Sequence, residues 1–168
     1  MGIITTNPNE RVEMFIDLMN IETVAGRGRV DYPLLCRILA NGRQIRCVRV
    51  YDHKGDDPEQ EMLHRRLKED GFRLVVQKTR AFDANKQVGV DVRLSVDVTM
   101  CALESGCDTI IVVSGDGDFC PLIESIKMRG KKAEFASFEE CANRCLVEDA
   151  DRFLLLDNIP MLRLEGSS

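Results

Sequence analysis

Apolar residues along this chain form short runs rich in β-branched side chains, and these runs alternate with stretches of helical spacing. The strand-like runs are Val12–Asp17, Ile45–Tyr51, Phe72–Gln77, Thr109–Ser114, Lys132–Ala136 and Phe153–Leu156. Strands that alternate with helices indicate βαβ units and a parallel sheet. The pattern therefore predicts an α/β fold.

Start and stop signals place helices in the intervals between these runs. We predict helices after Asp31, after Asp57, around Phe119–Ile126 and around Cys141–Val147, and a polar loop at Glu22–Val30. In the helix after Asp57, the spacing predicts a buried stripe of Met62, Leu63 and Leu67.

The segment from Val88 to Met100 is ambiguous, because every even-numbered position in it is apolar. A period of two alone is typical of a strand. However, the predicted strands on either side can be parallel only if a crossover joins them. We therefore predict a helix from about Asp91, its N-cap, to Ser105. Its buried stripe would contain Val92, Val96, Met100 and Leu103.

Carboxylates directly follow two of the predicted strands. One strand runs into SGDGDF at 114–119, and another ends in Asp17, with Asn20 three residues on. In open parallel sheets, ligands bind where strands end and helices begin, so neighbouring strands would bring Asp17, Asp116 and Asp118 into one crevice. Mg²⁺ takes such oxygen ligands. Each aspartate alone could equally cap a helix or form a turn, but the three together favour an acidic site.

Composition limits the classes of protein to consider. The 168 residues are 44% hydrophobic and 30% charged, as in one soluble domain. The sequence shows no apolar stretch long enough for a membrane span and no signal peptide, so we expect a cytoplasmic protein with no membrane partner. A net charge of −5 argues against tight nonspecific binding to nucleic acid, but it does not exclude an enzyme that holds phosphates through a metal and a local basic patch.

The seven cysteines include no C-x-x-C pair, and the two histidines have no cysteine close by. This spacing argues against a zinc site and favours reduced thiols in a cytosolic protein.

Three segments carry sequences that stand out together. They are FIDLMN at 15–20, KQVGVDVRLSVD at 86–97 and VSGDGDF at 113–119. In this order they resemble the signatures of the NYN domain family, specifically its LabA-like branch within the PIN-like nuclease superfamily. The resemblance spans about Val12 to Asp157, so we expect one domain over residues 1–168 with its core at about 12–157.

The resemblance implies a fold and an activity. The fold would be a PIN-like, Rossmann-like three-layer α/β/α sandwich with a mainly parallel central sheet. The activity would be that of a metal-dependent ribonuclease using Mg²⁺ or Mn²⁺. Leu18-Met19 stands where the family often has glycine and a polar residue, which makes the loop after Asp17 more apolar.

The resemblance also implies an acidic catalytic set. Its members here are Asp17, Asp91, Asp97, Asp116 and Asp118. We expect Asp17, Asp116 and Asp118 to lie closest to the metal, with Asp91 and Asp97 completing or orienting the shell. Asn20 and Ser114 would hydrogen-bond substrate or ligands.

Basic residues near the acidic site could bind a nucleic acid backbone. The candidates are Lys78, Arg80 and Lys86, which lie between a predicted strand end and the acidic helix. The expected partner is nucleic acid, RNA before DNA, and a homo-oligomer or a protein partner stays open.

Other enzyme classes fit less well. The chain has no G-x-x-x-x-G-K-[ST] sequence and no G-x-G-x-x-G after a strand, which disfavours P-loop and dinucleotide-binding enzymes. A Toprim-like site would end its earlier strand in glutamate, whereas this strand ends in Asp17. The serious alternative is a regulatory module of the same fold that binds RNA or protein with little or no catalysis.

Overall fold

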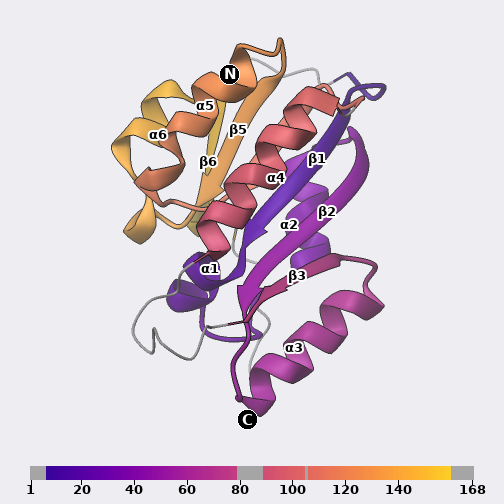
Figure 1. Ribbon diagram of the computed structural model, residues 1–168, viewed down its shortest axis with the longest axis vertical. Coiled ribbons are helices and arrows are strands. Elements are labelled where there is room, and N and C mark those ends of the chain that lie inside the picture. The colour runs from indigo at the N-terminus through magenta and orange to yellow at the C-terminus, as the bar shows by residue number, and fades with distance from the viewer. Residues whose placement is uncertain (1–6, 79–88, 105, 160–168) are drawn as a thin grey trace.

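A single sheet of parallel strands forms the centre of the molecule (Figure 1). The computed structural model of the chain describes residues 7–78, 89–104 and 106–159. The strands in these ranges are β1 (Arg11–Asp17), β2 (Gln44–His53), β3 (Arg73–Gln77), β4 (Thr109–Val113), β5 (Lys132–Ser137) and β6 (Arg152–Leu155). They lie in the order β3-β2-β1-β4-β5-β6, and each neighbouring pair is parallel. The predicted α/β fold is confirmed.

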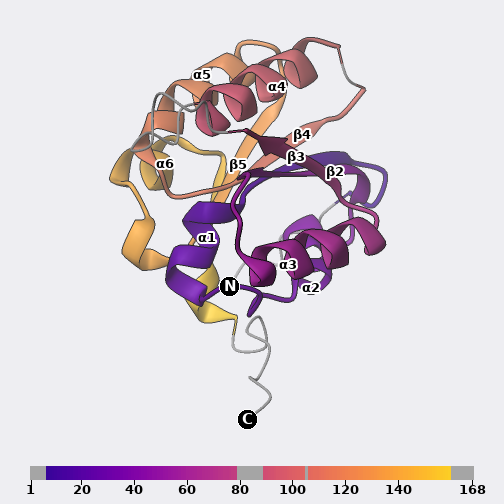
Figure 2. The same cartoon turned by 60° about the horizontal axis from the view of Figure 1, so that its bottom comes forward.

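Helices cover both faces of this sheet, which gives three layers (Figure 2). One face carries α1 (Leu18–Ala25), α2 (Tyr32–Ala40) and α3 (Pro58–Glu69). The other carries α4 (Val90–Glu104), α5 (Cys120–Lys127) and α6 (Arg144–Asp149). Short 3-10 turns occur at η1 (Gly117–Phe119), η2 (Glu139–Cys141) and η3 (Leu156–Asn158).

Strand β1 shows how the sequence divides the core. Val12, Met14 and Ile16 are buried against α1, α2 and α3, whereas Phe15 is buried against α4 and its neighbours. Successive side chains of a strand point to opposite faces, so a strand buried on both sides reads as a continuous apolar run. This explains why the strands were visible in the sequence.

The order in which strands are added to the sheet reverses between β1 and β4. Strands β2 and β3 extend it to one side of β1, and the later strands extend it to the other. Ile16 pairs with Val113, so the residues that follow these two, Asp17 and Ser114, leave the sheet side by side. Ligands of doubly wound sheets bind at such a switch point, beyond the carboxyl ends of the strands.

Several predicted helix ends are confirmed. Asp31 caps α2, because its side chain accepts a hydrogen bond from the amide of Leu34 at 2.9 Å. Asn41 ends the same helix in the left-handed region, with φ of 47°. Asp57 caps α3 by accepting from the amide of Glu59 at 2.9 Å. Side-chain oxygens at these positions satisfy amides that have no partner inside the helix.

Two local predictions on the α1 to α3 face are wrong. The polar loop predicted at Glu22–Val30 is helical as far as Ala25, because Leu18, Ile21 and Ala25 supply a buried stripe at helical spacing. On α3, Leu63 and Leu67 are buried as predicted, but Met62 is 62% exposed. Leu63 and Leu67 are one turn apart and face the sheet, and Met62 points away from them.

The ambiguous segment is a helix, as predicted, but it is rotated from the expected orientation. Helix α4 starts at Val90, so Asp91 lies in its first turn and is not the N-cap. The predicted stripe of Val92, Val96, Met100 and Leu103 is exposed, by 43 to 66%. The helix instead buries Val90, Leu94, Val98, Cys101 and Ala102. A segment with apolar residues at every second position presents an apolar stripe on more than one helix face, and the sequence does not say which of them meets the sheet.

The cysteines also differ from expectation. Cys120 and Cys145 form a disulfide that joins the start of α5 to α6. The prediction that all the cysteines are reduced is therefore wrong for this pair. The two residues are 25 positions apart, and only the packing of α6 against α5 brings them together.

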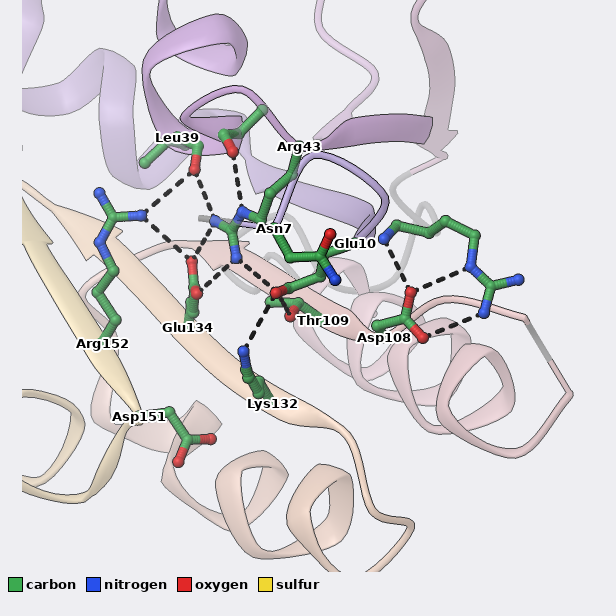
Figure 3. A network of polar contacts seen from close by, with 12 residues as sticks. Asn7, Glu10, Leu39, Arg43, Asp108, Thr109, Lys132, Glu134, Asp151 and Arg152 are labelled. Atoms are coloured by element: carbon green, nitrogen blue, oxygen red, sulfur yellow. Dashed lines mark hydrogen bonds and ion pairs between the residues drawn. The ribbon is translucent and has the colours of Figure 1, made fainter. Parts of the chain in front are cut away.

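The amino ends of the central strands are joined by buried ion pairs (Figure 3). The guanidinium of Arg43 donates to both carboxylate oxygens of Glu134, at 2.7 and 2.8 Å, and to Glu10 at 3.0 Å. It also donates to the carbonyl oxygens of Leu39 and Ala40 at the end of α2. One buried cation therefore connects α2, β5 and the residue before β1.

No helix in the described ranges is long and apolar enough to cross a membrane.

Candidate active site

Asp17 is the last residue of β1, and it is only 5% exposed. The hydroxyl of Ser114 donates to one of its carboxylate oxygens at 3.0 Å. The amide of Asn20 donates to the other at 3.3 Å, which makes Asp17 the N-cap of α1. Asp17 therefore has the capping role that its position suggested, and it also faces the residues that follow β4.

The loop after β4 is bonded to α1 through polar side chains. The side-chain oxygen of Asn20 accepts a hydrogen bond from the amide of Gly115 at 3.0 Å. The hydroxyl of Ser114 accepts from the amide of Asp116 at 3.3 Å. These bonds fix the backbone that carries Asp116 relative to Asp17.

The two glycines of the SGDGDF sequence are required by close packing. A Cβ atom on Gly115 would overlap the carbonyl oxygen of Cys141, and one on Gly117 would overlap the side chain of Asn143. Between them, Asp116 accepts a hydrogen bond from the amide of Asp118 at 2.9 Å and caps the turn η1. The glycines thus let the loop approach the chain after β5, and this approach places Asp116.

These residues line a cavity of about 320 Å³ at the switch point of the sheet. Its acidic residues are Asp17, Asp52, Asp91 and Asp116, and Asn20 and His53 also line it. Met19, which belongs to the apolar departure after Asp17, forms part of the wall. The cavity therefore collects carboxylates from β1, β2, α4 and the loop after β4.

Crowding of carboxylates makes ionisation unfavourable in this cavity. The pKa of Asp17 is raised to about 6, chiefly by burial; the charges of Asp91 and Asp116 add to the rise, and the hydrogen bonds from Asn20 and Ser114 oppose it. The pKa of Asp91 is also raised, by burial and then by the charges of Asp116 and Asp118. Like charges that share a desolvated site favour protonation unless a cation neutralises them.

Two of the predicted acidic residues do not line this cavity: Asp118 lies beside it, and Asp97 lies away from it. Asp118 is exposed and lines a neighbouring, more apolar cavity of about 510 Å³ together with Asp91. Asp97 lies further along α4, where its carboxylate accepts hydrogen bonds from the hydroxyl of Tyr51 at 2.9 Å and from Arg93. The structure thus brings Asp17, Asp91 and Asp116 together, and it places Asp97 against β2.

The predicted basic residues are only partly described. Lys78 is exposed directly after β3, at the same edge of the sheet as Asp17 but beyond β2. Arg80 and Lys86 lie outside the described residues.

A family comparison extends the resemblance over most of the chain. Residues 11–157 match the NYN domain family. This chain belongs to the NYN domain family.

Among solved structures, a protein of unknown function from Vibrio parahaemolyticus is similar to this NYN domain. The two are 25% identical, with a TM-score of 0.79, over 92% of this chain and 98% of the other. No curated protein gives a significant match. The comparisons therefore support the family and the PIN-like sandwich. NYN domains belong to the PIN-like nuclease superfamily, which points to nuclease chemistry.

The donor set of this NYN domain suits a hard divalent cation. All the acidic groups in the cavity offer oxygen, the atom that Mg²⁺ and Mn²⁺ prefer. In the described part of the chain, no three of these carboxylates bring their oxygens within 4.8 Å of one another. That spacing fits Mg²⁺, which is held by one or two carboxylates and completes its shell with water and substrate phosphate.

Sequence reasoning missed Asp52 and His53, which line the cavity of this NYN domain from the end of β2. Asp52 is 4% exposed and accepts from the side chain of Gln60 at 2.8 Å, and it lies 2.7 Å from Nε2 of His64. The signal was available, because a carboxylate directly after an apolar strand is the same feature that identified Asp17. The predicted strand ended at Tyr51, one residue before Asp52, and Asp52 was not considered with the other carboxylates that follow strands.

Proposed function

We propose that this NYN domain is a Mg²⁺- or Mn²⁺-dependent ribonuclease of the LabA-like branch that hydrolyses phosphodiester bonds in RNA. The observation that carries the proposal is the placement of Asp17, buried beside Asp91 and Asp116 at the switch point of the sheet. A fold gains no stability from concentrating like charges in a desolvated site, so a cation that binds there explains the arrangement.

The proposed cation ligands are Asp17, Asp91, Asp116 and Asp118, of which one or two would bind the ion directly and the others through its water molecules. A divalent cation bound among them supplies Lewis acidity, which activates water and stabilises charge on the scissile phosphate. Ser114 and Asn20 hold Asp17 and the loop after β4 in position through the hydrogen bonds described above. We propose Asp97 as a positioning residue, because it accepts from Tyr51 of β2 and so orients the helix that carries Asp91.

The proposed substrate contacts are basic residues of the sequence between β3 and α4. Lys78, Arg80 and Lys86 would bind the phosphates on either side of the scissile bond. Asn20 lines the acidic cavity and would contact substrate as well, whereas Ser114 is fully buried and would act through its hydrogen bond to Asp17. A location in the cytoplasm, and association with itself or with a protein partner, stay predictions from the sequence.

The proposal is tested by incubating labelled single-stranded RNA with the purified chain in Mn²⁺, in Mg²⁺ and in EDTA. We expect cleavage with either ion and none in EDTA. Asp116→Asn should reduce the rate about a hundredfold or more, because charge stabilisation by a metal is worth several kcal/mol. Asp70→Asn, an exposed position at the end of α3, is the matched control and should retain full activity.

The metal-binding measurement separates the remaining functions. If the folded chain binds Mn²⁺ but cleaves no RNA, the ribonuclease proposal fails and another phosphoester is the substrate. If it neither cleaves RNA nor binds Mn²⁺, the regulatory module that binds RNA or protein is the better account.

A further inference from the structure

Three potential metal ligands meet inside the α4 side of the core, away from the acidic cavity. Glu13 of β1, Cys101 of α4 and Cys107 of the segment before β4 are all buried, with exposed fractions of 4, 6 and 3%. Their ligand atoms lie within 4.8 Å of one another, and no other set in the described ranges does so. We propose that these residues form a second metal site, for a thiophilic divalent ion of the zinc class.

The distances match a tetrahedral zinc shell. Zinc–sulfur bonds of about 2.3 Å at a tetrahedral angle separate two sulfur atoms by about 3.8 Å, and a carboxylate oxygen at about 2.0 Å would lie about 3.5 Å from each sulfur. The sulfur atoms of Cys101 and Cys107 are 3.8 Å apart, and Cys101 Sγ lies 3.3 Å from Oε2 of Glu13. Two of the three distances therefore match the shell, and the third, from Cys107 Sγ to the Glu13 carboxylate, is within 4.8 Å.

The charges of the site balance when the ion is bound. Arg49 donates to the same oxygen of Glu13 at 2.7 Å, so the carboxylate and the guanidinium cancel while the thiols are neutral. Binding a divalent ion releases two thiol protons, and the two new thiolate charges offset the charge of the ion. A buried site can accept this exchange because its net charge does not change.

Solvent can reach the site from one side. Cys101 lines a cavity of about 320 Å³ together with Arg49, Arg73 and Glu104. This cavity is a route for the ion and a source of water for the fourth position of the shell. The spacing of the cysteines did not suggest the site, because one ligand comes from a strand 88 residues before Cys101.

The site is separate from the acidic cavity. Glu13 precedes Asp17 by four residues along β1, which is about 13 Å at about 3.3 Å per residue. A bound ion would tie β1 to both ends of the connection between α4 and β4.

Co²⁺ is used as the probe because thiolate ligands give it intense charge-transfer absorption and carboxylate ligands do not. The absorption therefore distinguishes this site from the acidic cavity. The full chain is titrated with Co²⁺ under a non-thiol reductant, and Zn²⁺ is then added. We expect thiolate charge-transfer bands that saturate at one equivalent and disappear on addition of Zn²⁺. The absence of such bands from the folded chain would overturn the proposal.

Substitutions then locate the ion. Cys101→Ser and Cys107→Ser should each abolish the bands, whereas Cys36→Ser, a buried cysteine of α2, should leave them unchanged. The double variant Cys120→Ser with Cys145→Ser should also keep the charge-transfer bands. If the bands were lost in this double variant and kept in Cys101→Ser and Cys107→Ser, the assignment would be overturned. If a serine variant does not fold, the unaltered chain is alkylated with and without Zn²⁺. We expect Zn²⁺ to protect Cys101 and Cys107 from the alkylating reagent, and equal alkylation with and without Zn²⁺ would contradict the site.

Discussion

At the scale of single residues, Asp17 joins two roles that are often separate. Its carboxylate caps α1, and it lies buried beside two other acidic groups. The sequence identified Asp17 and Asp116 because each comes just after an apolar strand, and the family resemblance added Asp91. It could not indicate how deeply Asp17 is buried, because burial depends on how the strands and helices pack together.

Asp17 should make the metal-free protein less stable as pH rises. Its pKa is about 6 in the folded chain against 3.8 ordinarily, so the folded state binds more protons between these values. Stability contributed by the protonated group is present below about pH 4 and falls by about 3 kcal/mol as pH rises through 6. In Asp17→Asn this decrease should disappear. Denaturant unfolding in EDTA at pH 4.5 and 7.5 should show about 2 kcal/mol of this decrease, since the rest lies below pH 4.5.

Asp31→Asn is the control for that experiment, because Asp31 caps α2 outside the cavity and should keep the pH dependence of the parent. Equal pH dependence in Asp17→Asn and the parent would show that Asp17 does not titrate as its burial indicates.

Asp97 and Asp116 should differ in how strongly they affect cleavage. Asp116 lines the acidic cavity, whereas the carboxylate of Asp97 is bonded to Tyr51 and Arg93. We therefore expect Asp97→Asn to lower the cleavage rate by about tenfold, less than Asp116→Asn, as for residues that orient metal ligands. Tyr51→Phe removes the same hydrogen bond and should give a similar loss. A loss with Asp97→Asn as large as that with Asp116→Asn would place Asp97 among the metal ligands.

At the scale of elements, α4 shows what periodicity can and cannot decide. The need for a crossover between parallel strands correctly predicted a helix in a segment whose period suggested a strand. The same period supplied two apolar stripes, and the buried one is set by contact with β1 and β2. By contrast, α1 was missed because it is only eight residues long and the polar loop was predicted to begin at Glu22, inside it.

The orientation of α4 can be tested with two substitutions on one helix. Leu94 is fully buried, so Leu94→Ala should lower the free energy of unfolding by about 2 to 5 kcal/mol. Val96 is 51% exposed, so Val96→Ala should change it by about 0.5 kcal/mol or less. Urea unfolding of both variants measures the difference, and the opposite order would mean that the helix buries the stripe predicted from sequence.

At the scale of the whole molecule, the alternation of strands and helices predicted the parallel sheet, and the family resemblance implied a helical layer on each of its faces. It did not predict the contacts that join distant segments. Arg43 meets Glu134 across 91 positions, and Cys120 meets Cys145 across 25. Such pairs depend on the finished packing, and no local pattern marks them.

Arg43 should be among the residues most important for stability, since its side chain is 2% exposed and pairs with Glu134 and Glu10. Removing one partner of a buried ion pair leaves the other charge uncompensated, so Arg43→Met should cost about 3 to 5 kcal/mol. Adding Glu134→Gln should recover part of this loss. The free energy of unfolding is measured with guanidinium chloride as denaturant. Arg46→Met, at an exposed arginine of β2, is the control. A loss with Arg43→Met no larger than with Arg46→Met would contradict the structural role of the network.

The most direct test of the central claim is the position of Mn²⁺ in crystals of the chain, located by anomalous scattering at the manganese edge. If the acidic cavity is a metal centre, a peak should lie between Asp17, Asp91 and Asp116, and Asp116→Asn crystals should lose it. A peak elsewhere, or an empty cavity in crystals whose protein cleaves RNA with Mn²⁺, would contradict the assignment of this cavity as the catalytic centre.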